Sequence, residues 1–175
     1  MLWSIDELKI MDKFSHIEVD ILERKMSAIE TAIRSYTNNN FMLLNTRTNC
    51  NCENGLLYCS TNVFNVGDTV QITKSNYNNG VYVIENIDGN CITLNEAINN
   101  ENSVTITKIY YPDDVMDGAL ELLDWSINSQ EKLFVSSESI SRHSVSYRSF
   151  NDSEMAYGYP KILMGFCNPY KKMRV

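Results

Sequence analysis

Apolar residues recur every three or four positions in residues 1–40, a spacing that predicts helices. Ser4 and Glu7 have the spacing of a capping box, which predicts the start of a short helix, and Ser15 and Glu18 repeat it. Behind the second pair, one apolar stripe predicts a longer amphipathic helix that ends at residues 37–40. The stripe consists of Val19, Leu22, Met26, Ile29, Ile33 and Tyr36.

From residue 41 to about residue 111 the helical spacing disappears and short β-branched runs take its place. The runs cover residues 70–72, 81–87, 91–94 and 103–111. Asn79-Gly80 and Asp88-Gly89 lie between runs, where hairpin turns require positive φ. This pattern predicts a compact antiparallel β barrel inserted between helices.

The helical pattern resumes after Tyr111, where Pro112 and Asp113 form a start signal. The following apolar face is wide enough to require more than one neighbour. The long N-terminal helix is one predicted neighbour, and an adjacent subunit is the other. The residues assigned to that subunit contact are Val115, Met116, Leu122 and Trp125.

Small hydroxyl residues alternate with apolar ones in residues 136–147, which predicts an extended arm or a hairpin. Pro160 predicts the first turn of a short helix, and Pro169 predicts its end. A basic and aromatic tail remains, which by composition is either a frayed end or a docking peptide. It consists of Pro169, Tyr170, Lys171, Lys172, Met173, Arg174 and Val175.

The expected fold class is therefore α+β. Residues 1–40 and 111–175 form a small body of antiparallel helices with an extended C-terminal arm, and residues 41–110 form the inserted β module.

Composition and charge narrow the functional classes. With 43% hydrophobic and 21% charged residues, the chain of 175 residues is typical of a globular domain. Its net charge of -7 provides no global field for nucleic acid. No apolar run approaches the roughly 18 residues of a membrane span, and the first residues are not a signal peptide, so we expect a cytosolic protein. Its five cysteines, an odd number, fit reduced thiols there.

Candidate chemistry is sparse, and we expect no catalytic residue, metal or cofactor. Cys50, Cys52 and Cys59 are the nearest approach to a ligand cluster, but a structural zinc site requires four ligands. The two histidines, His16 and His143, lie in no nucleophile motif. The acidic residues at the start of the third predicted helix suit its dipole. The glycines form no phosphate-binding loop.

The order of these elements resembles that of the head-tail connector proteins of tailed bacteriophages, also called adaptor or head completion proteins, in the form found in phages of Gram-positive hosts. Two parts of the chain carry the likeness. The first part consists of residues 66–72 and 79–84. The second part consists of residues 137–147, Tyr159-Pro160 and the tail. The resemblance spans nearly the whole chain, although the β module is larger than in minimal all-helical members.

This resemblance implies a structural virion protein, not an enzyme. Members form a ring, generally dodecameric, between the portal and the stopper or tail-completion (terminator) protein, in the virion neck assembled in the host cytoplasm. DNA passes through the channel without specific binding. Residues 169–175 would dock on the portal. The arm would contact the channel or the next ring through Ser139, Ile140, Arg142, His143, Val145 and Tyr147.

Two alternatives remain open. In the first, the β barrel binds a ligand or nucleic acid through Tyr58, Tyr77 and Tyr82, and the helices only carry it, although Lys74 is nearly the only cation among them. In the second, one of the three clustered cysteines serves a thiol-dependent or zinc enzyme.

Overall fold

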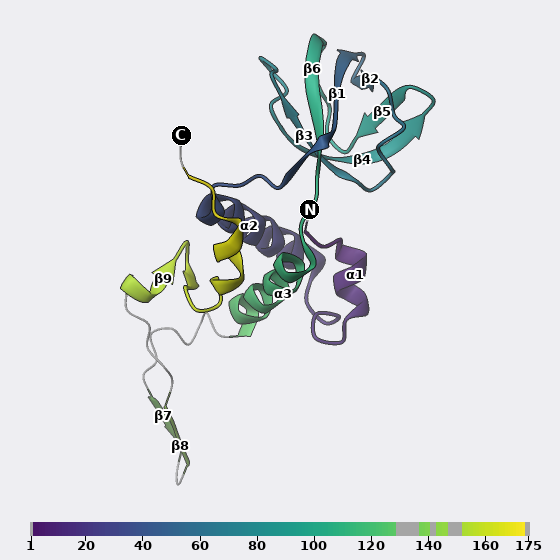
Figure 1. The fold of residues 1–175 in the computed structure, drawn as a ribbon. Coiled ribbons are helices and arrows are strands. Elements are labelled where there is room, and N and C mark those ends of the chain that lie inside the picture. The colour runs from purple at the N-terminus through teal and green to yellow at the C-terminus, as the bar shows by residue number, and fades with distance from the viewer. Residues whose placement is uncertain (1, 129–136, 141–142, 147–151, 174–175) are drawn as a thin grey trace. The chain divides into compact units, whose positions relative to one another are not determined.

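The computed structural model describes residues 2–128, 137–140, 143–146 and 152–173. It divides the chain into two units, each with its own buried core (Figure 1). Residues Met1–Asn39 and Tyr111–Val175 form the first unit, called the helical body here. Residues Asn40–Tyr110 form the second, called the barrel. The fold is α+β, with the barrel inserted in the sequence between helices.

Helix α1 (Ile5–Ile10) begins with the predicted capping box. The Glu7 N–H donates to Ser4 Oγ at 3.2 Å, and the Ser4 N–H donates to Glu7 Oε2 at 3.0 Å. The second predicted capping box is wrong, because Glu18 occupies the N-cap and its side chain makes no capping bond. Ser15 lies in the preceding turn, where its hydroxyl donates to the Asp12 carbonyl. Spacing alone therefore identified one true cap and one false one.

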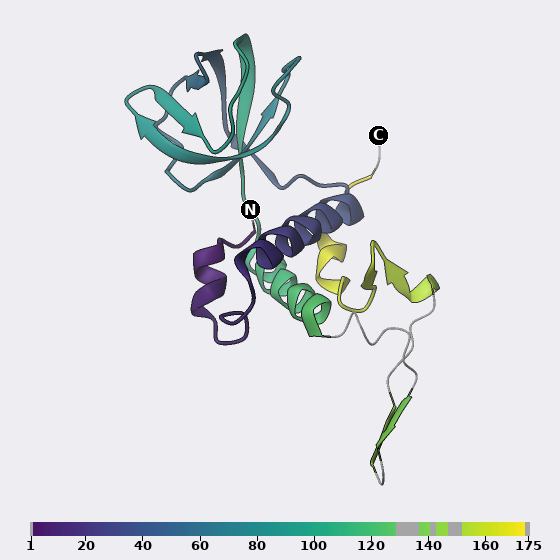
Figure 2. The ribbon, with the colours of Figure 1, turned by 180° about the vertical axis from the view of Figure 1, so that it is seen from behind.

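Helix α2 (Val19–Thr37) carries the predicted apolar stripe, except that its first member, Val19, is 43% exposed. Leu22, Met26, Ile29 and Ile33 are fully buried. The helix ends where Asn38 adopts a left-handed conformation with φ 49°, which an Asn side chain tolerates. The stripe packs on α3 (Asp113–Asn128), and both views of the ribbon show the two helices side by side (Figures 1 and 2).

The predicted helix from Pro160 is wrong. Strands β9 (Met155–Ala156) and β10 (Tyr159–Pro160) form a short hairpin instead. Its turn uses positive φ at Tyr157 (52°) and Gly158 (84°), a conformation that a helix does not contain. The 3-10 helix η2 (Asp152–Glu154) precedes this hairpin, and the 3-10 helix η3 (Gly165–Tyr170) follows it. Pro169 lies inside η3 and does not end it.

The second unit is a closed antiparallel barrel, as predicted, with strand order β1-β2-β5-β4-β3-β6. Its strands are β1 (Met42–Glu53), β2 (Leu56–Tyr58), β3 (Thr69–Thr73), β4 (Gly80–Asp88), β5 (Cys91–Leu94) and β6 (Glu101–Ile109). Alternate residues of each strand face the interior. The barrel core contains Cys50, Cys52, Leu57, Phe64, Val70, Ile72, Ile84, Ile92, Leu94, Ile98, Val104 and Ile106.

One of the two predicted hairpin turns is confirmed. Gly89 has φ 57° and joins β4 to β5, as Asp88-Gly89 predicted. The other is wrong, because Gly80 begins β4 without positive φ, and the left-handed residue after β3 is Lys74. A tight Asn54-Gly55 turn, with φ 53° and 80°, joins β1 and β2 and was not among the predicted turns.

Candidate functional site

The C-terminal segment packs against α2 and α3 of the helical body. Met164 and Cys167 are fully buried, and the Trp125 and Tyr159 rings lie 5.8 Å apart between centroids. Gly118 of α3 allows the Phe166 ring to approach closely, since a Cβ there would lie 2.3 Å from a ring carbon. The segment is therefore part of the folded body up to η3.

The first part of the predicted docking tail is held by α3. The Tyr170 hydroxyl lies 2.7 and 2.9 Å from the two carboxylate oxygens of Asp114. Hydrogen bonding to this carboxylate raises the pKa of Tyr170. Asn39 Nδ2 donates to the Tyr170 carbonyl at 3.1 Å. Tyr170 is therefore half-buried and bonded to its own chain on two sides.

The next residues of the tail are held by the end of α2. The Lys171 ammonium lies 3.8 Å from the centroid of the Tyr36 ring, a cation–π contact. The Lys172 N–H donates to the Thr37 carbonyl at 2.8 Å, and Asn38 Nδ2 donates to the Met173 carbonyl at 3.1 Å. The tail is therefore held by its own chain up to Met173, an arrangement that its composition did not indicate, while Arg174 and Val175 lie outside the described residues.

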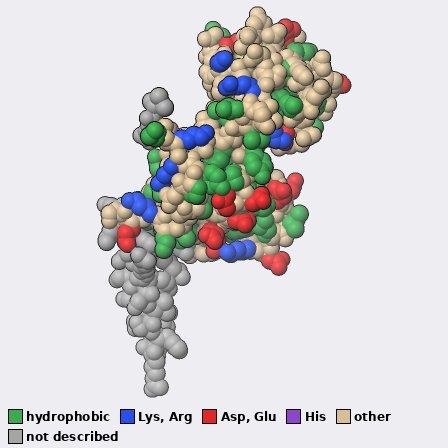
Figure 3. Space-filling view, in the orientation of Figure 1, with side chains coloured by type: hydrophobic (Ala, Val, Ile, Leu, Met, Phe, Trp, Pro, Cys, Tyr) green, Lys and Arg blue, Asp and Glu red, His purple; other side chains and the backbone are tan. Residues whose placement is uncertain are grey.

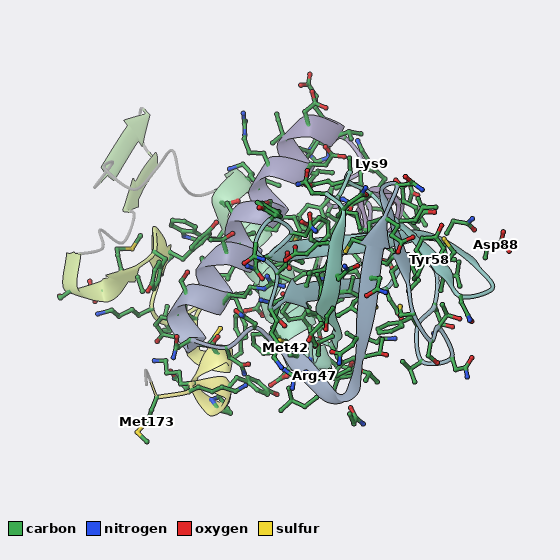
Figure 4. All side chains as sticks on the ribbon, turned by 90° about the horizontal axis from the view of Figure 1, so that it is seen from above. Lys9, Met42, Arg47, Tyr58, Asp88 and Met173 are labelled. Carbon is green, nitrogen blue, oxygen red and sulfur yellow. The ribbon has the colours of Figure 1, made fainter. Side chains whose placement is uncertain are left out.

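Met173 is the residue of this tail whose side chain points most clearly into solvent. It is 91% exposed, and Figure 4 shows it directed away from the helical body. The backbone of Met173 is nevertheless fixed by Asn38. The tail thus combines a held backbone with one exposed apolar side chain.

The predicted arm contains a two-stranded hairpin, β7 (Ser137–Ile140) with β8 (His143–Ser146). Ser137 lies opposite Ser146, and Ile140 lies opposite His143. Within the described part of the chain, these strands pair only with each other. Of the predicted contacts, Ser139, Ile140, His143 and Val145 belong to the hairpin, whereas Arg142 and Tyr147 lie outside the described residues.

The predicted subunit-interface residues of α3 do not form an exposed face. Val115 and Leu122 are fully buried in the core of the helical body, so neither offers surface to a neighbour. Met116 and Trp125 are half-buried, and the Met116 carbonyl accepts the Trp3 indole N–H at 2.9 Å. The apolar face was wide because α3 packs on α2, η3 and the N-terminal segment of its own chain.

The outer side of α3 is acidic. It carries Asp113, Asp114, Asp117, Glu121 and Asp124 and no Lys or Arg. Figure 3 shows acidic side chains gathered over α1 and α3 on one face of the body, and Lys and Arg side chains over the C-terminal segment. The helical body thus presents two surfaces of opposite charge.

The candidate ligand and acid–base groups can be located in the described residues. Across them, no group of three or more His, Cys, Asp or Glu side chains could hold a metal ion. Asp114 is bound by Tyr170 and by the Val115 N–H, which is a structural role. Cys50 and Cys52 lie in the barrel core, where burial raises the pKa of the Cys52 thiol to about 11.

The barrel has an open pocket that no sequence pattern above predicted. Its volume is about 460 Å³, and it is lined by Tyr77, Ile98, Asn99 and Asn100. The neighbouring loop is fixed by Glu101, whose carboxylate accepts the Asn76 N–H at 2.6 Å and the Tyr77 N–H at 3.4 Å. One sequence signal could have indicated the pocket. Both segments that line it are rich in asparagine, with Tyr77 in one segment and Ile98 in the other.

The three tyrosines considered for stacking differ in exposure. Tyr77 is 73% exposed and Tyr58 is 42% exposed, whereas Tyr82 is half-buried and donates its hydroxyl to the Asn78 carbonyl. Tyr82 is therefore hydrogen-bonded within the barrel.

Of the helices that the structure describes, none combines the length and the apolar character needed to cross a bilayer. The chain matches no protein-family model, and no curated protein matches it.

Proposed function

We propose that the protein is a structural component of the neck of a tailed bacteriophage. It assembles into a ring, generally dodecameric, that joins the portal to the stopper or tail-completion protein and completes the DNA exit channel. This assignment rests on the resemblance of the chain to connector proteins. The observation that carries it is the β7–β8 hairpin.

A two-stranded hairpin is marginally stable in water by itself. Strands β7 and β8 have two edges that no other described strand pairs with. Such edges are templates for another chain. A hairpin of this kind is therefore suited to an assembly in which a neighbouring subunit or ring completes it.

The charge distribution supports a ring. A ring subunit makes heterologous contacts that close by rotation, so it needs two different and complementary faces. The acidic outer side of α3 and the basic C-terminal segment are such a pair. The net charge of -7 also repels DNA, which suits a channel that DNA passes without specific binding.

The tail can dock on the portal in two ways. Either it keeps its contacts within the chain, or contacts with the portal replace them. Solvent weakens contacts between groups at the surface. A partner with an acidic or apolar groove can therefore replace the contacts of Tyr170 and Lys171. The exposed Met173 side chain is the first group available to it.

The test is assembly of the full-length protein on its cognate portal ring, followed by electron microscopy and mass determination. We expect a ring on the portal. Replacing residues 137–146 with a Gly-Ser linker should abolish ring closure, and deleting residues 170–175 should abolish portal attachment. Lys74→Ala, a charge change on an exposed barrel loop, is the matched control. A ring that forms on the portal without residues 137–146 would contradict the proposal.

A second candidate function is ligand binding by the barrel, and the pocket beside Tyr77 favours it. An exposed aromatic ring next to Asn side chains suits a neutral, hydrogen-bonding ligand or a stacked base. Titration of oligosaccharide and single-stranded DNA probes, monitored by amide NMR shifts at Asn99 and Asn100, tests this candidate. Shifts confined to the pocket would favour it over the connector assignment.

A further inference from the structure

The register of the β1–β2 hairpin brings two cysteines of the barrel face to face, one within β1 and one just after the last residue of β2. In the β1–β2 pair, Glu53 faces Leu56, Cys52 faces Leu57 and Asn51 faces Tyr58. One further step along the same register places Cys50 opposite Cys59. The spacing of the cysteines in the sequence did not indicate this pairing, because it depends on the Asn54-Gly55 turn.

The Asn54-Gly55 turn also determines whether Cys50 and Cys59 form a hydrogen-bonded or a non-hydrogen-bonded pair. In a hairpin with a two-residue turn, the residues flanking the turn are hydrogen-bonded, and the pairs then alternate. Cys50 and Cys59 therefore form a non-hydrogen-bonded pair. The Cys59 N–H agrees, because it donates away from β1 to the Asn90 carbonyl at 3.0 Å.

This type of pair has suitable spacing for a cross-link. Opposite Cα atoms in a non-hydrogen-bonded pair are about 4.5 Å apart, and disulfides span Cα separations of about 4.4–6.8 Å. Both side chains lie on the inner side of the hairpin, where Cys50 belongs to the barrel core and Cys59 packs against it, whereas Tyr58 between Leu57 and Cys59 is 42% exposed.

The two thiols interact and differ in reactivity. Cys50 is only 2% exposed, whereas Cys59 is half-buried and reachable from solvent. A hydrogen bond from the Cys50 thiol lowers the pKa of Cys59, and the same interaction together with burial raises the pKa of Cys50. Cys59 is thus the attacking thiolate and Cys50 the resolving thiol.

We propose that Cys50 and Cys59 form a reversible disulfide, with a low-molecular-weight disulfide such as oxidised glutathione as the oxidant. The Cys59 thiolate attacks one sulfur of the oxidant, which forms a mixed disulfide and releases one glutathione. Cys50 then loses its proton and attacks Cys59 Sγ, and the second glutathione leaves. Two protein thiols are oxidised, and one glutathione disulfide is reduced to two thiols.

No other pair of cysteines in the described structure is placed this way. Cys52 faces Leu57, and Cys91 faces Tyr58 on one side and Asp88 on the other. Cys167 belongs to the helical body. The bond would close the hairpin around Asn54-Gly55 and restrict the unfolded barrel, which raises the unfolding temperature. A disulfide here does not depend on the connector assignment.

The test is oxidation of the full chain with oxidised glutathione, followed by alkylation and peptide mapping by mass spectrometry. We expect loss of two of the five thiols, a Cys50–Cys59 link, and a rise in unfolding temperature that dithiothreitol reverses. Cys59→Ser should abolish both changes, and Cys91→Ser, on the neighbouring strand, should retain them. A different pairing, or five free thiols in the oxidised wild-type protein, would overturn the proposal whether or not the variants fold.

Discussion

Gly118 in α3 has no room for a side chain. A Cβ there would lie 2.3 Å from Cδ1 and Cε1 of Phe166 and 2.6 Å from Cγ, so the ring as a whole would have to move. Alanine favours a helix over glycine by about 1 kcal/mol, but overpacking costs about 1–3 kcal/mol. We expect Gly118→Ala to destabilise the helical body, measured as a lower midpoint of denaturant unfolding followed by far-UV circular dichroism.

A matched glycine provides the control for this effect. A Cβ added at Gly165 would meet no atom within 4 Å, and Gly165 lacks positive φ, so Gly165→Ala should leave the midpoint nearly unchanged. Combining Gly118→Ala with Phe166→Leu should recover part of the loss, because the smaller side chain relieves the overlap. Additive effects of the two changes would contradict this explanation.

Tyr111 joins α2 through buried polar contacts. Its hydroxyl donates to Glu30 Oε1 at 2.8 Å and accepts the Arg34 Nε–H at 2.7 Å. Burial, with the Glu30 charge as the second cause, raises the pKa of Tyr111 well above its usual value. The unfolded chain loses this proton near pH 10, whereas the folded chain keeps it. The contribution of Tyr111 to stability is therefore fully present below pH 10 and decreases as the pH rises further.

Tyr111→Phe tests both parts of this argument. Loss of a buried hydroxyl that pairs with Glu30 should cost about 1–3 kcal/mol at neutral pH. The difference in free energy of unfolding between wild type and variant should then shrink above pH 10, as measured by urea denaturation across the pH range. Tyr77→Phe, on an exposed barrel loop, should follow the wild-type profile. A difference that stays constant from pH 7 to the alkaline limit would disprove the assigned cause.

Elements with a single buried stripe could be predicted from the sequence, and elements fixed by distant contacts could not. Helix α2 followed directly from its apolar spacing. Strand β1 was missed because its outer positions are Asn, Thr and Arg, which weaken the strand pattern. The β9–β10 hairpin depends on positive φ at Tyr157, which a tyrosine rarely adopts.

The same limit applies to the candidate site. Composition identified the basic and aromatic tail but left open whether it frays or docks. The groups that hold it, Asp114, Tyr36 and Thr37, lie far from it in sequence, and no local pattern links them to the tail. The Cys50–Cys59 pair needed the register that follows from Asn54-Gly55, a strong hairpin signal that was not among the predicted turns.

The tail, which contacts the end of α2, should protect the last turn of this helix from amide hydrogen exchange. Removal of residues 170–175 removes the Lys172 N–H bond to the Thr37 carbonyl and the Lys171 contact with Tyr36. We expect faster amide hydrogen exchange in the last turn of α2 and unchanged exchange in α1. Lys171→Ala should reproduce part of the effect, and Lys161→Ala, an exposed position before η3, should not. Equal exchange in the truncated and full-length proteins would show that the tail contacts are not maintained in solution.

At the scale of the whole molecule, the barrel has what an independently folding unit requires. Its sheet is closed, so no described strand of the barrel is left with an open edge. Its core consists of residues 50–106 alone. The chain enters and leaves at adjacent points, because the Tyr110 N–H donates to the Phe41 carbonyl at 3.0 Å.

We therefore expect residues 40–110 to fold alone, although a unit of this size has a small core and modest stability. The measurement is a dispersed amide NMR spectrum with a single cooperative thermal transition. The reciprocal chain, with residues 40–110 replaced by a short Gly-Ser linker, should keep its helical circular dichroism, because α2, α3 and η3 supply its core. A fragment 40–110 without chemical-shift dispersion would show that the barrel depends on the helical body for folding, which its closed sheet and separate core argue against.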